Sequence, residues 1–155
     1  MYQVNISAPN LVCVCVNEMR EAGPVGSVYH KYSDEGYTFR NEFDILRYME
    51  KVMDYCQYPQ SSTQLRTFGN ETYQYREKKK VETMVTADEL LEKSGELATF
   101  VIHVKYRQNS TWQGDIFWTE KQEKRNFRSA LELLKLIDGA LDQIEDDAET
   151  EETEE

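Results

Sequence analysis

The amino-acid sequence predicts an α+β domain in which two similar strand-rich units each end in one long helix. Residues 12–54 align without a gap onto residues 100–142, at a constant offset of 88 residues. Identical pairs at this offset are Gly26 and Gly114, Phe39 and Phe127, Arg40 and Arg128, and Leu46 and Leu134. Two units with the same hydrophobic period and the same turn residues, in the same order, are the signature of a duplicated fold element.

Each unit is expected to begin with three strands, because short runs of alternating or β-branched residues are separated by turn residues. The strands expected in the first unit cover residues 12–16, 25–32 and 37–40, with a turn over 33–36. Those expected in the second unit cover residues 100–106, 115–119 and 125–128. Strands this close together in sequence pair as antiparallel neighbours, so the sequence predicts an antiparallel sheet.

A long amphipathic helix is expected after the third strand of each unit, over residues 41–57 and 129–144. Each begins with a capping box, in which Asn41 precedes Asp44 and Ser129 precedes Glu132 by three residues. Apolar residues then recur at the spacing that gives a helix one buried face. They are Ile45, Met49, Val52 and Cys56 in the first helix, and Leu133, Ile137, Ala140 and Ile144 in the second. We therefore expect both helices on one face of the sheet.

The chain length suits one compact domain, which we place at residues 1–144. It comprises repeat one over 11–57, an insert over 58–97 and repeat two over 98–144. Within the insert, Thr86 and Glu89 form a third capping box, which predicts a short helix ended by Gly95. The stretch 73–85 has the weak alternation of a polar hairpin or an edge strand.

The last eleven residues, 145–155, are expected to form a disordered acidic tail. The formal net charge is −11, and eight acidic residues of this segment leave only −3 for the rest of the chain. Like charges repel one another, and a segment without large apolar residues cannot bury enough surface to fold.

The sequence also favours a cytoplasmic protein that does not enter a membrane. It shows no secretory leader and no apolar run of membrane-spanning length. The three cysteines, Cys13, Cys15 and Cys56, are an odd number without the spacing of a disulfide scaffold, which is typical of a reducing compartment.

Catalytic and metal-binding chemistry find little support in the sequence, so we expect no enzyme, no cofactor and no metal. His30 and His103 lie outside any motif for nucleophilic, metal or phosphate chemistry. Cys13 and Cys15 face the same way on a strand and could begin a zinc site, for which Cys56 and His30 are the only further soft ligands. Cysteine on an apolar strand is more often a small core residue.

The candidate binding residues are aromatic side chains and arginines, most of them in the second unit. They are Arg40, Tyr106, Arg107, Trp112, Trp118, Arg125 and Arg128. Aromatic rings and arginines on a sheet can stack bases and neutralise phosphates, but the same types are enriched at protein interfaces. Arg40 and Arg128 each precede a helix N-cap, where the helix dipole disfavours a cation, so each guanidinium should have a specific partner, for which an acidic side chain such as Asp44 or Glu132 is one candidate.

Three binding functions follow from these residues and from the acidic tail. The first is a non-enzymatic binding or regulatory module that presents a sheet face or the loop around Trp112 to a protein partner. The alternative is a single-stranded nucleic-acid-binding protein that uses the aromatic and arginine face around Trp112 and Trp118. A third possibility, suggested by the tail alone, is an acidic inhibitor that mimics nucleic acid. The balanced charge of the domain favours the protein partner, because nucleic-acid affinity comes largely from phosphate neutralisation.

The segments 106–114 and 127–138 resemble a group of uncharacterised small proteins common in anaerobic Gram-positive bacteria. These segments are Tyr-Arg-Gln-Asn-Ser-Thr-Trp-Gln-Gly and Phe-Arg-Ser-Ala-Leu-Glu-Leu-Leu-Lys-Leu-Ile-Asp, within about the last third of the chain. The resemblance implies a bacterial cytoplasmic origin. In plan, duplicated strand-rich units that each end in one helix are similar to the Pur-domain and Whirly single-stranded nucleic-acid binders, although a shared plan does not carry function.

Overall fold

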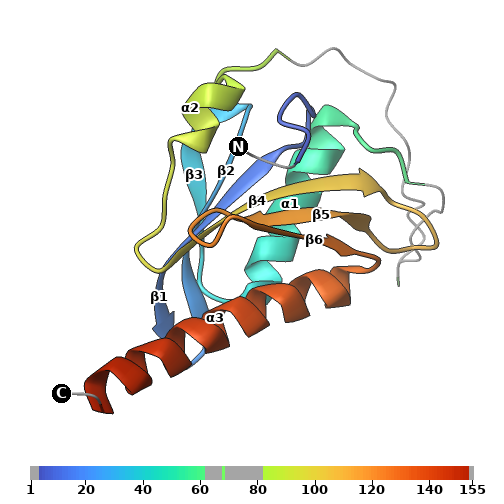
Figure 1. Ribbon diagram of the computed structural model, residues 1–155. Helices are drawn as coiled ribbons and strands as arrows, with labels where there is room; N and C mark the ends of the chain where they lie inside the picture. The colour runs from blue at the N-terminus through green and yellow to red at the C-terminus, as the bar shows by residue number, and fades with distance from the viewer. Residues whose placement is uncertain (1–3, 62–67, 69–81, 154–155) are drawn as a thin grey trace.

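The computed structural model describes residues 4–61, 68 and 82–153 and contains one six-stranded sheet with helices against both of its faces (Figure 1). The strands are β1 (Val12–Arg20), β2 (Gly23–His30), β3 (Ser33–Phe39), β4 (Ala98–Tyr106), β5 (Gln113–Trp118) and β6 (Glu123–Phe127). The helices are α1 (Glu42–Cys56), α2 (Ala87–Leu91) and α3 (Ala130–Thr153). Most of the hairpin or edge strand expected over 73–85 lies outside the described residues.

The strand order is β3-β2-β1-β4-β5-β6, and every neighbouring pair is antiparallel. The predicted α+β class and antiparallel sheet are therefore confirmed. Cross-strand partners in the two halves are related by the offset of 88 residues. Val14 pairs with Val28 as Ile102 pairs with Ile116, and Gly26 pairs with Phe39 as Gly114 pairs with Phe127. A Cβ on either glycine would overlap a carbonyl oxygen of the neighbouring strand and the ring of its paired phenylalanine. Glycine is thus the residue that lets this ring lie across the strand.

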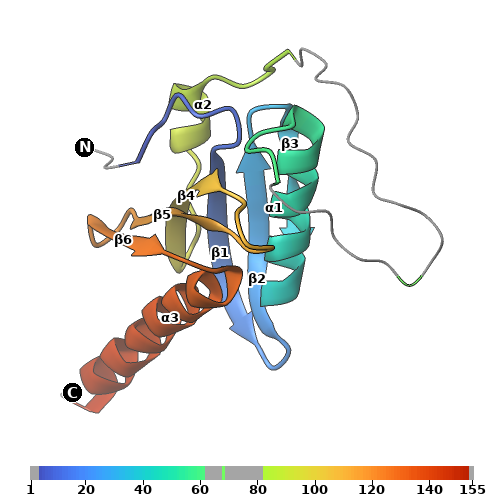
Figure 2. The same cartoon turned by 90° about the vertical axis from the view of Figure 1, so that its right-hand side faces the viewer.

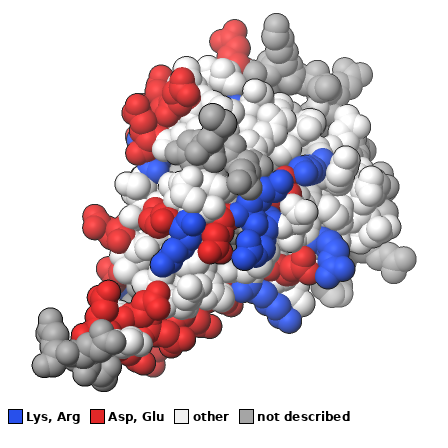
Figure 3. Space-filling model, viewed as in Figure 1, with Lys and Arg blue, Asp and Glu red and all other residues white. Residues whose placement is uncertain are grey.

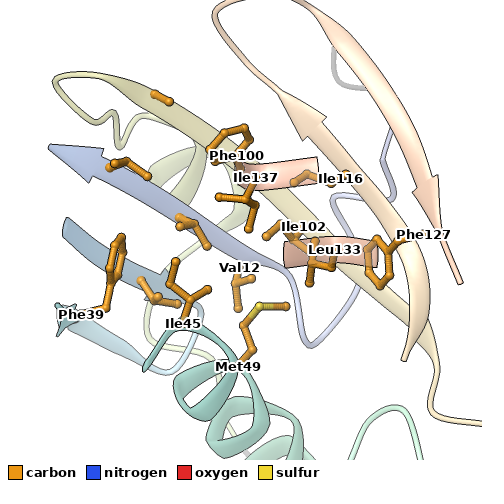
Figure 4. Close-up of a cluster of buried hydrophobic side chains, with 14 of the residues drawn as sticks. Val12, Phe39, Ile45, Met49, Phe100, Ile102, Ile116, Phe127, Leu133 and Ile137 are labelled. Atoms are coloured by element: carbon orange, nitrogen blue, oxygen red, sulfur yellow. The ribbon is translucent and has the colours of Figure 1, made fainter. Parts of the chain in front are cut away.

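The larger part of the core lies between the sheet and the two long helices. Figure 4 shows Ile45 and Met49 of α1 approaching it from one side, and Leu133 and Ile137 of α3 from the other. Alternation places Val12, Val14 and Val16 of β1 and Phe100, Ile102 and Val104 of β4 on this face. The helix stripes predicted from sequence are buried here, apart from Cys56 and Ile144, which are half-buried.

The opposite face of the sheet is also covered. The N-terminal segment and α2 bury Cys13, Cys15, Val101 and Phe117 beneath Val4 and Leu90. His103 of β4 is buried on this face as well and is only 4% exposed. The sequence periodicity of the strands shows two faces, but the covering segments are short and give no strong amphipathic signal of their own.

The turn between β2 and β3 lies two residues earlier than predicted. Lys31 and Tyr32 make the turn, and residues 33–36 belong to β3. The Lys31 ammonium donates to the carbonyl oxygens of Ile6 and Ala8, both at 2.9 Å, which ties the turn to the N-terminal segment. Gly36 lies within the strand. A glycine is needed at this position because a Cβ would overlap the ring of Tyr29 on β2.

The helix α3 is longer than predicted and extends to Thr153, so the expectation of a disordered tail is wrong over residues 145–153. Its last core residue is Leu141, with Ile144 half-buried, and residues 145–151 are exposed. Once a helix has formed, each added residue requires no new nucleation, and glutamate has a good helix propensity. Figure 2 shows this part of α3 projecting beyond the sheet.

Candidate functional site

The predicted aromatic and arginine face does not assemble around Trp118. This side chain is 8% exposed and packs on Phe100, with ring centroids 6.1 Å apart. The Lys121 ammonium lies 5.8 Å from the centre of the indole. Trp118 has the same strand parity as Ile116, so it points into the helix-covered core. Its ring therefore contributes to the core and is closed to a stacking base.

Arg107 is a structural residue. Its side chain is 11% exposed, and its guanidinium donates to Asp54 Oδ1 of α1 at 3.0 Å and to the Pro59 carbonyl oxygen at 2.6 Å. The residue thus joins the end of β4 to the end of α1. A buried guanidinium held by a carboxylate and a carbonyl has few donors left for a ligand.

The remaining predicted arginines are exposed but do not form one patch. Arg125 of β6 pairs with Glu123 at 3.3 Å, and Arg128 pairs with Glu132 at 3.3 Å. The Arg128 pairing confirms the predicted carboxylate partner. Arg40 lies before α1, in the other half of the sheet, and its guanidinium forms no ion pair with a described residue. Its backbone N–H donates to Asp44 Oδ2 at 3.2 Å.

The loop around Trp112 supports the start of α3. The Thr111 hydroxyl accepts a hydrogen bond from the Ala130 N–H at 3.1 Å, and the half-buried Trp112 ring packs against the core. Tyr106, at the end of β4, is exposed. Of the aromatic residues predicted for this region, Tyr106 alone offers an open ring.

Charges in the second half of the sheet are largely paired within the molecule. The buried Asp115 carboxylate lies 2.8 Å from the Lys105 ammonium and 3.8 Å from that of Lys124. Figure 3 shows acidic side chains gathered over the exposed part of α3, on a face where Lys and Arg side chains are interspersed with Asp and Glu. Such a surface lacks the cationic excess that a phosphate backbone requires.

The four soft ligands considered for zinc are divided between the two faces of the sheet. Cys13 and Cys15 lie beneath α2, whereas His30 stacks on Tyr37 on the face that carries α1, which contains Cys56. Among the described residues, no three His, Cys, Asp or Glu side chains are grouped so as to hold a metal ion. In the same part of the chain, no helix is both long enough and apolar enough to span a bilayer.

A different set of side chains forms an exposed surface on the outer side of α1. We define the α1 outer face as Phe43, Arg47, Lys51 and Tyr55, which follow one another at intervals of four residues. All four are exposed, with Phe43 at 65% and Tyr55 at 59%. Residues four apart lie on the same side of a helix, so these groups form one row. Figure 2 shows α1 on the outside of the β1–β3 half.

Stacked rings support the α1 outer face from below. Tyr48 stacks on Tyr37 of β3 with centroids 4.8 Å apart and planes 10° apart, and the Lys51 ammonium lies 5.5 Å from the centre of Tyr48. Tyr55 meets the edge of Tyr32 at 5.4 Å. The Arg47 guanidinium lies 6.0 Å from the centre of the Phe43 ring. Stacked aromatic side chains with few rotatable bonds lose little entropy on binding a partner.

The corresponding face of α3 lacks this chemistry. At the offset of 88 residues its exposed row is Leu131, Lys135, Gly139 and Gln143. One apolar side chain and one cation remain, and no aromatic ring is present. The aromatic and cationic character is therefore specific to α1.

Sequence reasoning overlooked the α1 outer face, although the row has a clear signal. Its members recur every four residues, on the side of the helix opposite Ile45 and Met49. Both tryptophans and most of the candidate arginines lie in the second half, whereas this row consists of phenylalanine, arginine, lysine and tyrosine in the first. Comparisons with protein-family models, with curated proteins and with solved structures find no match for this chain.

Proposed function

We propose that the protein is a non-enzymatic binding module whose recognition surface is the α1 outer face, and that its partner is a protein segment rich in carboxylates. The observation that carries this proposal is the exposed row of two aromatic and two cationic side chains. Tyrosine and arginine are enriched among the residues that contribute most binding energy at protein interfaces.

Charge favours an acidic partner. Lys51 forms no ion pair with a described residue, and Arg47 has one carboxylate nearby, Asp44, at 3.9 Å. Arg40 adds a third exposed cation at the start of the same helix. An acidic segment would find complementary charge here and apolar contact with the rings, which favours association rate and specificity.

We also infer that the two halves of the chain are structural repeats, over residues 11–57 and 98–144. The equal registers and the shared glycine–phenylalanine contacts support this inference. The capping contacts are equivalent too: the Asp44 N–H donates to Asn41 Oδ1 at 2.9 Å, and the Glu132 N–H to Ser129 Oγ at 3.0 Å. In this interpretation the helices of both repeats share the same type of buried face, and the outer face of α1, in the first repeat, carries the binding function.

The repeat plan supplies matched controls for a test of the binding face. The full-length protein is purified from its native cell, co-purifying proteins are identified by mass spectrometry, and the dissociation constant of each purified candidate is measured. Arg47→Glu and Tyr55→Ala should each raise the dissociation constant of the true partner by about tenfold or more. Lys135→Glu and Leu131→Ala make comparable changes on α3 and should leave binding within about twofold. Equal effects of both pairs would refute the proposed surface.

The nucleic-acid alternative is tested with a labelled single-stranded oligonucleotide at low salt. We expect weak binding or none, because the chain as a whole is acidic. Tight binding that weakens steadily as salt is added, and that Tyr55→Ala abolishes, would instead favour a nucleic-acid ligand on the same face.

A further inference from the structure

Two cysteines lie side by side on the opposite side of the sheet from the α1 outer face. Cys13 and Cys15 are two residues apart on β1, and their sulfur atoms are 3.8 Å apart. Residues two apart on a strand point to the same face, so the backbone itself brings these thiols together. Both are almost completely buried.

The connector of residues 92–97, between α2 and β4, forms part of the cover over the thiols, beside the N-terminal segment and α2. Cys13 Sγ lies 3.8 Å from the Lys93 carbonyl oxygen, and the Leu97 N–H donates to the Val16 carbonyl oxygen at 2.9 Å. Most of the outer side chains of the connector are exposed. The Gly95 N–H also donates to Thr99 Oγ1 at 3.0 Å and the Glu96 N–H to Asn17 Oδ1 at 3.2 Å, so opening of the connector must break these bonds. A short surface segment can open in this way without unfolding the sheet.

Gly95 allows the connector to lie this close to the sheet. A Cβ at this position would overlap the backbone of Val16 and the carbonyl oxygen of Ala98. A larger residue must therefore lift the connector away from β1. Gly95 therefore sets how closely the connector approaches β1.

The surroundings distinguish the two thiols. The hydrogen bond from Cys13 lowers the pKa of Cys15, while the same shared proton and burial raise the pKa of Cys13. The Lys93 ammonium acts to lower the pKa of both, and the Glu120 carboxylate acts to raise it. Cys15 is thus the better nucleophile and Cys13 the proton-bearing partner.

We propose that Cys13 and Cys15 are a redox-active pair that closes to an intramolecular disulfide by exchange with a low-molecular-weight disulfide. The Cys15 thiolate attacks one sulfur of the small disulfide, forms a mixed disulfide and releases the first small thiolate. Cys13 then loses its proton to solvent and attacks the sulfur of Cys15, which releases the second small thiolate. The protein loses two electrons and two protons, and the small disulfide becomes two thiols.

Formation of the disulfide between Cys13 and Cys15 strains the central strand β1. Two steps along a strand separate the Cα atoms by roughly 6.6 Å, near the upper limit for a disulfide. The residue between them, Val14, faces the main core and pairs with Val28 and Phe100. The bond should therefore be easily reduced, and the oxidised protein should melt at a lower temperature than the reduced one.

The test uses the full chain with Cys56→Ser, which removes the third thiol and leaves a hydroxyl in its place. After treatment with glutathione disulfide, the native protein should lose the mass of two hydrogen atoms, within the peptide that contains residues 13 and 15. Adding Cys13→Ser should trap one glutathione on Cys15. An unchanged mass in native buffer, when the same protein oxidises in urea, would overturn the proposal. Two bound glutathiones in the Cys56→Ser protein would do the same.

The role of the connector is tested by the rate of the same reaction. Gly95→Ala should increase the rate several-fold, because the added methyl group lifts the cover. Gly139→Ala on α3 is the matched control, since a Cβ there meets nothing within 4 Å. Circular dichroism verifies that both variants are folded. Equal rates for the two variants would show that the connector does not control access.

Discussion

Glu42 brings a carboxyl group to the contact between α1 and α3, beside Asp138 and Asp142. Burial, a hydrogen bond with Asp138 and the charges of both aspartates raise its pKa from the ordinary 4.5 to about 7. The folded protein therefore binds the proton of the Glu42 carboxyl group more tightly than the unfolded chain does. Stability contributed by the protonated group is fully present below about pH 4.5 and is lost as the pH rises through about 7.

Glu42→Gln should remove this pH dependence. The amide can still form a hydrogen bond with Asp138 and carries no charge, so the variant should melt at a higher temperature than the wild type above pH 7. Near pH 4.5 the two melting temperatures should converge. Thermal melts between pH 4 and 8 provide the measurement, with Glu35→Gln on the exposed edge strand β3 as the control. Curves for Glu42→Gln and wild type that run parallel over this range would contradict the assigned contact.

Single residues also show where sequence reasoning succeeds and where it cannot. The carboxylate partner of Arg128 could be predicted because Glu132 lies four residues further along the chain, in the first turn of α3. The partner of Arg107 could not, because Asp54 is brought to it by the packing of α1 against the sheet. The burial of Trp118 was available from strand parity, since Ile116 two residues earlier belongs to the core.

Elements with strong local signals were predicted well. The helix starts at α1, α2 and α3 follow the three capping boxes, and the Thr86 hydroxyl accepts from the Glu89 N–H at 3.2 Å. The turn over 33–36 was placed wrongly because a glycine in a polar run is typical of a turn. In the structure Gly36 lies within β3, where it leaves room for the ring of Tyr29. The end of α3 was missed because no capping residue marks it and no tertiary contact is needed to continue a helix.

Ser129 provides a measurable test of one helix start. Its hydroxyl accepts the Glu132 N–H at 3.0 Å, and Ser129→Ala removes this cap. We expect a loss of roughly 0.5–2 kcal/mol in the free energy of unfolding. Chemical denaturation gives this value directly, and Ser129→Asn, which can cap the same N–H, should retain most of the stability. An alanine variant as stable as wild type would remove Ser129 from this role.

At the scale of the whole molecule, the two halves share one core. The central strands β1 and β4 pair from Val12 with Ile102 to Val16 with Ala98. Side chains of α1 and α3 enter the same cluster from either side of this pair (Figure 4). Unfolding either half would expose the apolar surface of the other, so the domain should unfold in one cooperative transition.

Both tryptophans lie in the second half, which makes this cooperativity testable. Gly26→Ala disturbs the first half, because a Cβ would overlap the Cys15 carbonyl oxygen and the Phe39 ring. We expect a loss of about 1–3 kcal/mol from overpacking. If the halves unfold together, tryptophan fluorescence must report the same lowered midpoint as far-ultraviolet circular dichroism. A fluorescence midpoint that stays at the wild-type value while the dichroism signal falls in two steps would show that the halves unfold separately. Gly114→Ala, the equivalent change in the second half, should lower both midpoints by a similar amount, because the same contacts recur there.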